Sequence, residues 1–235
     1  MNHKQQIVHI GGGEAFNSYD QYINYLQSVP LWHMEKSQES LPWYKKYGEY
    51  LNEKKYECIK IPMPNDSNAR YNEWKIWFER HIPFLRDGVI LVGHSLGGIF
   101  LAKYLSHNTL LVDIEQLHLV AAPYDNENKK EQLADFKITE FPNDFYENTI
   151  SRIHIYHSKD DTVVPISESE KYHKALPESQ LRIFDDRFHF LLAMTYESQG
   201  RIKVAQEEYL EFINQFPNSE YKMTALIKAR MLGRR

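Results

Sequence analysis

The sequence predicts an α/β fold in which a mostly parallel β-sheet is covered by helices on both faces. Short apolar segments alternate with segments of helical periodicity, and this alternation is typical of parallel sheets. A length of 235 residues with 42% hydrophobic residues is sufficient for one sizeable domain. The sharpest local signal is a strand, a glycine-rich turn and a helix in direct succession at residues 89–105.

The other elements of the sheet follow from the spacing of apolar residues. Strands are expected at residues 6–10, 56–61, 117–122, 153–157 and 181–184. Helices are expected at residues 18–28, 43–52 and 72–81, and from about residue 165 onward. The single cysteine, Cys58, falls within an expected strand, so we interpret it as a packing residue, and no intramolecular disulfide can form.

The turn at the centre of the chain has the pattern Gly-x-Ser-x-Gly. Four apolar residues at 89–92 predict a buried strand, Gly93-His94-Ser95-Leu96-Gly97 follows, and residues 99–105 have helical periodicity. A strand, a sharp turn and a helix are the context that a nucleophile elbow requires. In that geometry the hydroxyl of Ser95 stands above the sheet edge, and the amide of Leu96 is able to donate to a developing oxyanion. The alternative is an ordinary glycine-rich turn.

With this turn the chain resembles the α/β-hydrolase superfamily. Within it, the chain is similar to small serine hydrolases without a large lid, such as retinoblastoma-binding protein 9 and the YdeN-like proteins. A second shared feature is the turn Ile61-Pro-Met-Pro-Asn65, which precedes a helix that carries Trp74 and Trp77. The resemblance covers roughly residues 5–190 and implies esterase-type chemistry without identifying a substrate. The polar segment 124–148 lies where larger hydrolases insert a lid, and its shortness favours an open site.

The partners of a catalytic serine should follow it in the order acid, then histidine. Asp160 and Asp161 lie in the turn after the expected strand at 153–157. Family members have an aspartate four residues before a proline, and this resemblance assigns the acid to Asp161, which stands four residues before Pro165. Asp160 is the alternative by one position. The non-catalytic interpretation is an acidic turn that caps the following helix.

His189, at the end of the turn after the expected strand at 181–184, is the candidate base. It would take the proton of Ser95 and return it to the leaving group, while Asp161 would hold the imidazole tautomer. The family usually has glycine immediately before this histidine, whereas this chain has Phe188. A large side chain there is expected to shift the turn, so Phe188 argues for a weakened site.

The second oxyanion donor is expected from the run Gly11-Gly12-Gly13, which follows the first strand. Similar hydrolases supply this donor from the same loop. We assign the second oxyanion donor to the amide of Gly12, in addition to the amide of Leu96. A phosphate-binding nucleotide loop is the rival, but the segment lacks the full Gly-x-Gly-x-x-Gly and Walker patterns. No His-Glu-x-x-His motif or cysteine cluster indicates a metal, so neither a cofactor nor a metal is expected.

The C-terminal segment is helical without a strand signal and resembles one tetratricopeptide repeat. The residues that match the repeat pattern are Leu192, Ala193, Tyr196, Gly200, Ala205, Tyr209 and Pro217. A further helix is expected at 219–230. We therefore expect a hydrolase domain at 1–190 and a helical extension at 191–235. One repeat cannot bury its own apolar face, so it must pack on the hydrolase body, on a second copy or on a protein partner. In the repeat register the first helix begins near Asp186 and competes for His189. The alternative is one final helix with an elongated tail.

These observations together predict a serine hydrolase that cleaves small carboxylic esters or amides through an acyl-enzyme on Ser95. The alternative is a weak or inactive hydrolase-fold protein that acts as a protein-interaction module through its C-terminal helices. A net charge of −4 from interspersed residues offers no basic surface for nucleic acid. No apolar run approaches a membrane span and no signal-peptide core is present at the N-terminus, so a cytoplasmic location is expected.

Overall fold

The computed structural model describes residues 4–28, 56–125, 132–138, 141, 145, 150–185, 193–194, 196–197, 202–219 and 221–233. The chain divides into two compact units. The first comprises residues 1–29, 54–157 and 162–183, and the second comprises residues 30–53, 158–161 and 184–235. The helix expected at 43–52 lies outside the described residues, and the predicted domain boundary at residue 190 stays a prediction.

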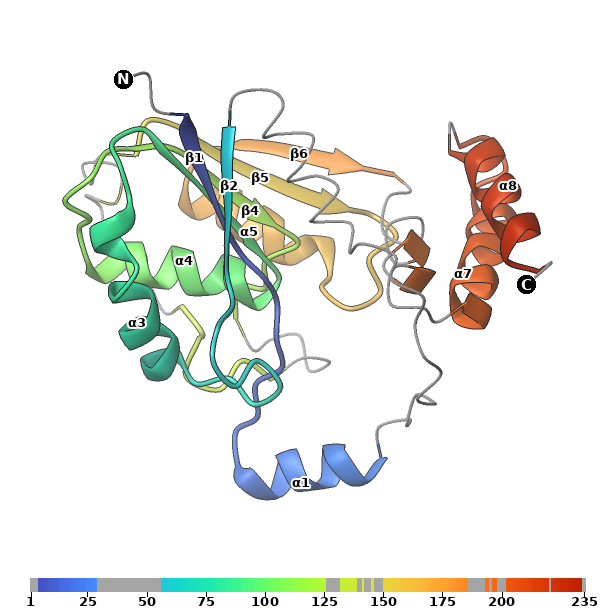
Figure 1. The fold of residues 1–235 in the computed structure, drawn as a ribbon, viewed down its shortest axis with the longest axis horizontal. Coiled ribbons are helices and arrows are strands. Elements are labelled where there is room, and N and C mark those ends of the chain that lie inside the picture. The colour runs from blue at the N-terminus through green and yellow to red at the C-terminus, as the bar shows by residue number, and fades with distance from the viewer. Residues whose placement is uncertain are drawn as a thin grey trace. The chain divides into compact units, whose positions relative to one another are not determined.

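The first unit is built on a six-stranded sheet with the order β2-β1-β3-β4-β5-β6. Its strands are β1 (Gln5–Ile10), β2 (Tyr56–Ile61), β3 (Val89–His94), β4 (Ile114–Val120), β5 (Ile153–Ser158) and β6 (Gln180–Phe184). All pairings from β2 across to β5 are parallel, and Figure 1 shows the strands side by side. This mostly parallel sheet with helices confirms the predicted fold class.

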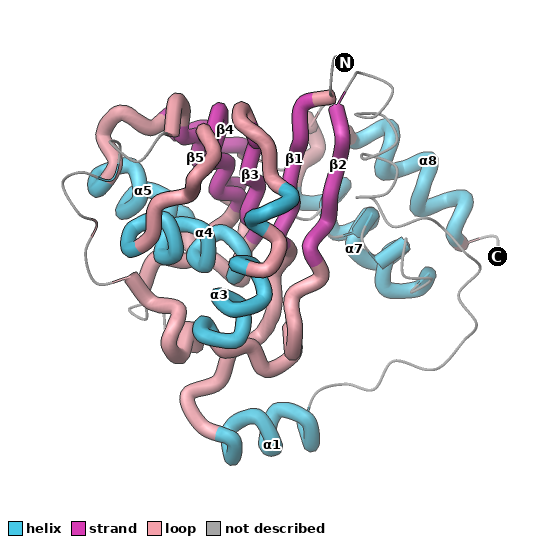
Figure 2. Tube along the Cα trace, turned by 60° about the vertical axis from the view of Figure 1, so that its left-hand side comes forward, coloured by secondary structure: helices cyan, strands magenta, loops and turns pink. Residues whose placement is uncertain are grey.

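Helices follow the strands in the order that the periodicity predicts. In the first unit they are α1 (Tyr19–Ser28), α3 (Tyr71–Glu79), the short 3-10 helix η1 (Ile82–Phe84), α4 (Leu96–His107) and α5 (Ile166–Ala175). Figure 2 shows α3, α4 and α5 along one face of the sheet. On that face the strands contribute fully buried side chains, whereas on the other face residues such as Ile7 and His9 of β1 are half-buried.

Several boundaries differ from the sequence expectation, and two of them lie next to Ser95. Helix α4 begins at Leu96, directly after the turn, rather than at residue 99. Strand β4 ends at Val120 because Ala121 adopts a positive φ of 45° and its amide donates to the carbonyl of Tyr156, 2.8 Å away. A positive φ is incompatible with strand geometry, so the chain leaves the sheet there.

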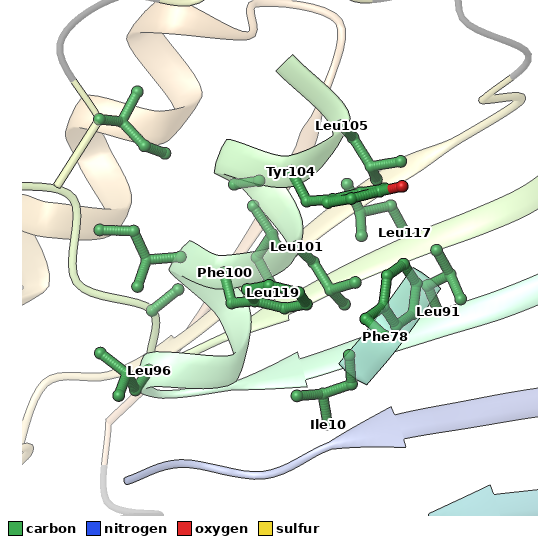
Figure 3. Packing of buried hydrophobic residues seen from close by; sticks show 14 of the residues in the cluster. Ile10, Phe78, Leu91, Leu96, Phe100, Leu101, Tyr104, Leu105, Leu117 and Leu119 are labelled. Carbon is green, nitrogen blue, oxygen red and sulfur yellow. The ribbon is translucent and has the colours of Figure 1, made fainter. Parts of the chain in front are cut away.

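Helix α4 lies at the centre of the hydrophobic core. Nine of its residues are buried, because the sheet covers one side and α3 packs on another. Phe100 contacts both Trp74 and Phe78 of α3 in edge-on geometry, with ring centroids 5.6 Å apart in each pair. Figure 3 shows the side chains of α4 among those of β1, β3 and β4. This packing fixes the start of α4, where Ser95 stands.

The two tryptophans of α3 hold the Met-Pro-rich turn. The indole of Trp74 donates to the carbonyl of Pro64 at 2.8 Å, and that of Trp77 donates to the carbonyl of Pro62 at 2.9 Å. These bonds explain why the turn and the Trp-bearing helix occur together in the sequence. The turn then continues into Asp66, whose carbonyl accepts from the amide of Glu14 at 2.7 Å.

The second unit contains the helical hairpin of α7 (Ile202–Gln215) and α8 (Lys222–Leu232). Its small core consists of Ala193, Ala205, Tyr209, Phe212, Ala225, Ala229 and Leu232. Glu197 joins the helices, because its carboxylate accepts from Tyr209 at 2.8 Å and from Lys228 at 2.6 Å. The predicted helical C-terminus is confirmed. The assignment to a tetratricopeptide repeat stays a prediction, and its turn residue Gly200 lies outside the described residues.

Candidate active site

Ser95 occupies the sharp turn between β3 and α4 in a strained conformation. Its backbone has φ 51° and ψ −124°, a combination that residues with a side chain rarely adopt. Two hydrogen bonds hold it: the Ser95 amide donates to the carbonyl of Val120 at 2.9 Å, and the Gly98 amide donates to the carbonyl of Ser95 at 2.8 Å. The predicted strand, turn and helix are therefore present, and the serine is fixed at the carboxyl end of a central strand.

The two glycines of the motif allow backbone segments to pack closely around the serine. A Cβ at Gly93 would lie 2.5 Å from the carbonyl oxygen of Gly97. A Cβ at Gly97 would lie 2.5 Å from the carbonyl oxygen of Gly11, which real Cβ atoms do not approach. The absence of side chains thus lets the first turn of α4 rest against the end of β1. Strain at Ser95 is maintained by these surroundings.

The glycine segment after β1 passes directly beside the serine. A Cβ built on Gly12 would lie 3.1 Å from Cβ of Ser95 and 3.4 Å from its Oγ. Leu96, whose amide is the other predicted oxyanion donor, is buried at the start of α4. The structure therefore brings together Gly12, Ser95 and Leu96, three of the five residues that the sequence singled out.

A small hollow opens beside the serine. It is lined by Gly13, Glu14, Ala15, Ser95, Leu96, Pro123, Gln132 and Leu133. Its lining is mixed: Glu14, Ser95 and Gln132 contribute polar groups, and the remaining side chains are apolar. The lining comes from the segments after β1, β3 and β4, because the carboxyl ends of neighbouring parallel strands meet at one edge of a sheet.

The acidic pair lies in the turn that follows β5. The hydroxyl of Ser158 donates to the carboxylate of Asp160, and the amide of Asp161 donates to the carbonyl of Ser158 at 3.2 Å. The amide of Lys159 donates to the carbonyl of Phe184 at 2.8 Å, which joins the ends of β5 and β6. The carboxylate of Asp160 thus has a partner within its own turn. The candidate base His189 and its neighbour Phe188 lie outside the described residues.

The sequence profile of one protein family, described as "Serine hydrolase", matches residues 38–204, which is most of the chain. The chain belongs to the serine hydrolase family. A search among functionally curated proteins gave no match. The family assignment agrees with the strained serine and with the α/β sheet that carries it.

Solved structures show the same fold. The ydeN gene product from B. subtilis has a TM-score of 0.60 at 19% identity and covers 77% of this chain and 85% of that protein. MGS-M1, an α/β-hydrolase enzyme from a Medee basin deep-sea metagenome library, has a TM-score of 0.52 at 14% identity over 78% and 69%. Est1E from Butyrivibrio proteoclasticus has a TM-score of 0.50 at 16% identity over 91% and 90%. At these sequence identities the likeness shows a shared fold alone.

Two buried polar residues of this serine hydrolase connect α5 and its preceding segment to the ends of the strands, and sequence reasoning missed both roles. The first is His157, a buried residue at the end of β5. Its Nε2 lies 2.7 Å from the carbonyl oxygen of Val164, which only accepts, so Nε2 carries the proton. Its Nδ1 then accepts from the hydroxyl of Ser169 in α5, 2.6 Å away. The imidazole therefore ties β5 to the segment that leads into α5.

The second of these residues is Glu168, a buried carboxylate in α5. It accepts from the amides of Tyr124 at 2.8 Å and Asp125 at 3.1 Å, and it pairs with Lys171 at 3.1 Å. Nearby, the hydroxyl of Tyr172 donates to the carbonyl of Pro123 at 2.8 Å, and burial raises the pKa of this phenol. Helix α5 thereby fixes the segment after β4, which contributes Pro123 to the hollow.

Neither a membrane helix nor a metal cluster is found in the part of the chain that the structure describes. None of the described helices is long and apolar enough to cross a membrane. No group of three or more His, Cys, Asp or Glu side chains among the described residues is arranged to hold a metal ion.

Proposed function

We propose that this serine hydrolase cleaves small carboxylic esters or amides through an acyl-enzyme on Ser95. The observation that carries the proposal is the strained Ser95, held at φ 51° beside Gly12 and at the edge of the hollow. A strained turn of this kind presents the hydroxyl to a substrate without rearrangement. The small size of the hollow, with both polar and apolar lining residues, suits a small substrate.

In the proposed mechanism, Oγ of Ser95 attacks the carbonyl carbon while His189 accepts the hydroxyl proton. The tetrahedral intermediate places its negative charge near the amides of Gly12 and Leu96, which we assign as the oxyanion hole. Collapse breaks the bond to the alcohol or amine, which leaves with the proton from His189. Water then attacks the acyl-enzyme by the same route and releases the carboxylic acid.

Asp161 is our choice for the acid that orients His189. The carboxylate of Asp160 accepts from Ser158 in the same turn, and this supports a structural role for Asp160. Asp161 also stands four residues before Pro165, the spacing that the family resemblance implies. The assignment gives the chain order Ser95, Asp161, His189 that α/β-hydrolases share.

Hydrolysis of p-nitrophenyl acetate by matched variants tests these roles. Ser95→Ala and His189→Ala are expected to lower kcat by about 10³-fold or more, and Asp161→Asn by a comparable factor. Asp160→Asn is the matched control for the acid and should stay within about threefold of the wild type, because its carboxylate is not assigned to the reaction. Loss of activity in Asp160→Asn with retention in Asp161→Asn would reverse the assignment of the acid.

A second role, self-association through the C-terminal helices, rests on the exposed face of α8. Met223, Ile227 and Met231 recur every four residues on this helix and are 55–63% exposed. The exposed face of α7 carries Leu210 with Glu207 and Glu211, whereas Arg230 accompanies the apolar residues of α8. The opposite charges and the shared apolar character favour packing of α8 on α7 of a second copy. This role would accompany hydrolysis.

A further inference from the structure

Among the described residues that line the hollow, Glu14 is the one with a formal charge. It shares that lining with Ser95. The other polar lining side chain, Gln132, is neutral, and its carbonyl oxygen accepts from the amide of Asn17 at 3.2 Å. Apart from the hydroxyl of Ser95, the remaining lining side chains are apolar or absent. Glu14 is therefore placed to distinguish substrates by their charge.

The backbone of Glu14 is fixed on both sides. Its amide donates to the carbonyl of Asp66 at 2.7 Å, and its carbonyl accepts from the amide of Ala69 at 2.8 Å. The segment 66–69 is itself connected to the turn that Trp74 and Trp77 hold. These hydrogen bonds fix the Cα of Glu14, which lies two residues after Gly12 in the same backbone segment.

Within the part of the chain that the structure describes, no cation forms an ion pair with the Glu14 carboxylate. Arg70, on the adjoining segment, donates to the carbonyl of Phe16 at 2.5 Å. The Glu14 carboxylate instead interacts with the phenol of Tyr25. Burial, followed by the charge of Glu14, raises the pKa of Tyr25. The side chain of Glu14 keeps contact with solvent, yet desolvation by its surroundings raises the pKa of its carboxyl.

A carboxylate that is partly desolvated, and that forms no ion pair with a described residue, attracts a cation and repels an anion. We infer that Glu14 makes this site selective for esters or amides that carry a positive charge, such as an ammonium group, next to the scissile bond. The inference rests on the proposed hydrolysis at Ser95 and names the chemical class of its substrate. Free carboxylates near the scissile bond should be disfavoured for the same reason.

Three thioacetate esters of matched shape test this selectivity. The leaving groups are thiocholine, which is cationic, 3,3-dimethylbutanethiol, which is its neutral isostere, and a thiol of similar length that ends in a carboxylate. At low ionic strength the wild type should favour the cationic over the neutral ester about tenfold in kcat/KM, and disfavour the anionic ester. This preference should weaken in about 0.5 M salt, because salt screens interactions with exposed charges.

Glu14→Gln keeps the size of the side chain and should bring the ratio of cationic to neutral ester close to one, and Glu14→Lys should invert it. Glu170→Gln, which removes an exposed carboxylate of α5 outside the hollow, should retain the wild-type ratio. Partial unfolding of a variant would lower all three rates together and leave the ratio unchanged. A ratio that Glu14→Gln does not alter, with the neutral ester hydrolysed, would overturn the selectivity proposal alone. If the wild type hydrolyses none of the three esters, the proposed function fails and the selectivity with it.

Discussion

Gly12 lies so close to Ser95 that one added methyl group would disturb the serine. The methyl carbon of Gly12→Ala would lie 3.1 Å from Cβ of Ser95 and 3.4 Å from its Oγ. We expect Gly12→Ala to lower kcat/KM by about 10-fold to 100-fold, because small displacements of reacting groups are costly in catalysis. Gly11→Ala is the matched control, since a Cβ there meets no atom within 4 Å. Equal activity of the two variants would contradict the assignment of Gly12.

Gly97 is required for folding rather than for chemistry. A Cβ at this position would overlap the backbone at the end of β1, with the carbonyl oxygen of Gly11 only 2.5 Å away. Neither backbone segment is able to yield easily, so Gly97→Ala should lower the free energy of unfolding by about 2–3 kcal/mol. Urea denaturation measures this difference, with Gly11→Ala again as the control. An unchanged midpoint would show that α4 does not need this close approach.

Some of these residue roles could be predicted from the sequence and others could not. Ser95 was predicted because its strand, turn and helix are adjacent in the chain. Gly12 was predicted from the family resemblance, and the structure places it beside Ser95. The roles of His157 and Glu168 depend on partners brought near by folding, and Glu168 binds amides more than forty residues away. No local pattern encodes such a contact.

At the scale of elements, α5 stabilises the segment after β4 through Glu168. This carboxylate is almost fully buried and accepts from two backbone amides, which would be left without a partner in Glu168→Ala. We expect that change to lower the free energy of unfolding by about 3 kcal/mol, as for other broken buried charge networks. Glu170→Ala, two residues away and exposed, should change it by about 0.5 kcal/mol or less. Equal effects of the two substitutions would contradict the role of Glu168.

Two stacked histidines, His118 on β4 and His154 on β5, are expected to make the stability of the sheet depend on pH. The rings of His118 and His154 are stacked with centroids 4.8 Å apart. Burial, followed by the charges of His154 and Arg152, lowers the pKa of His118 from 6.5 to about 4. Between these values the unfolded chain binds a proton that the folded chain does not. The free energy of unfolding should therefore fall as pH decreases from 6.5 towards 4.

Urea denaturation at pH 7 and pH 5 measures this dependence. His118→Gln removes the titrating ring and should reduce the loss of stability between the two pH values. An equal loss in the wild type and in His118→Gln would show that the histidine does not contribute. Because only the difference between the two proteins is compared, other titrating groups cancel.

The start of α4 shows why element boundaries are harder to predict than elements. Periodicity placed the helix from residue 99, because Gly97 and Gly98 are poor helix formers. The observed helix begins at Leu96, since packing of its first turn against β1 requires glycine and compensates for low propensity. Similarly, the end of β4 is determined by the backbone conformation of Ala121, which no sequence pattern predicted.

At the scale of the whole molecule, the chain combines a hydrolase unit with a helical unit that exposes apolar side chains. Self-association through α8 predicts that the mass measured by sedimentation equilibrium rises with protein concentration. Ile227→Glu should keep the protein monomeric, because it places a charge in the apolar face. Ile76→Glu on α3 is the matched control, since Ile76 is 56% exposed and Ile227 is 55% exposed. A wild type that stays monomeric at all concentrations would contradict this role.

The fold of this serine hydrolase could be predicted from sequence because alternating strands and helices determine a parallel sheet. The composition of the hollow could not, because Pro123, Gln132 and Leu133 come from a polar, irregular segment. Pockets are formed by loops that meet in space, and their sequences carry no periodicity. The charge of Glu14 therefore became informative only when its place beside Ser95 was known.

Covalent labelling by a fluorophosphonate probe, mapped by peptide mass spectrometry, tests the proposed nucleophile most directly. The probe reacts with a serine only when a neighbouring base activates it. We predict a single labelled residue, Ser95, with labelling lost in Ser95→Ala and greatly reduced in His189→Ala. A folded wild-type protein that does not react, or that is labelled at a residue other than Ser95, would contradict the proposed mechanism.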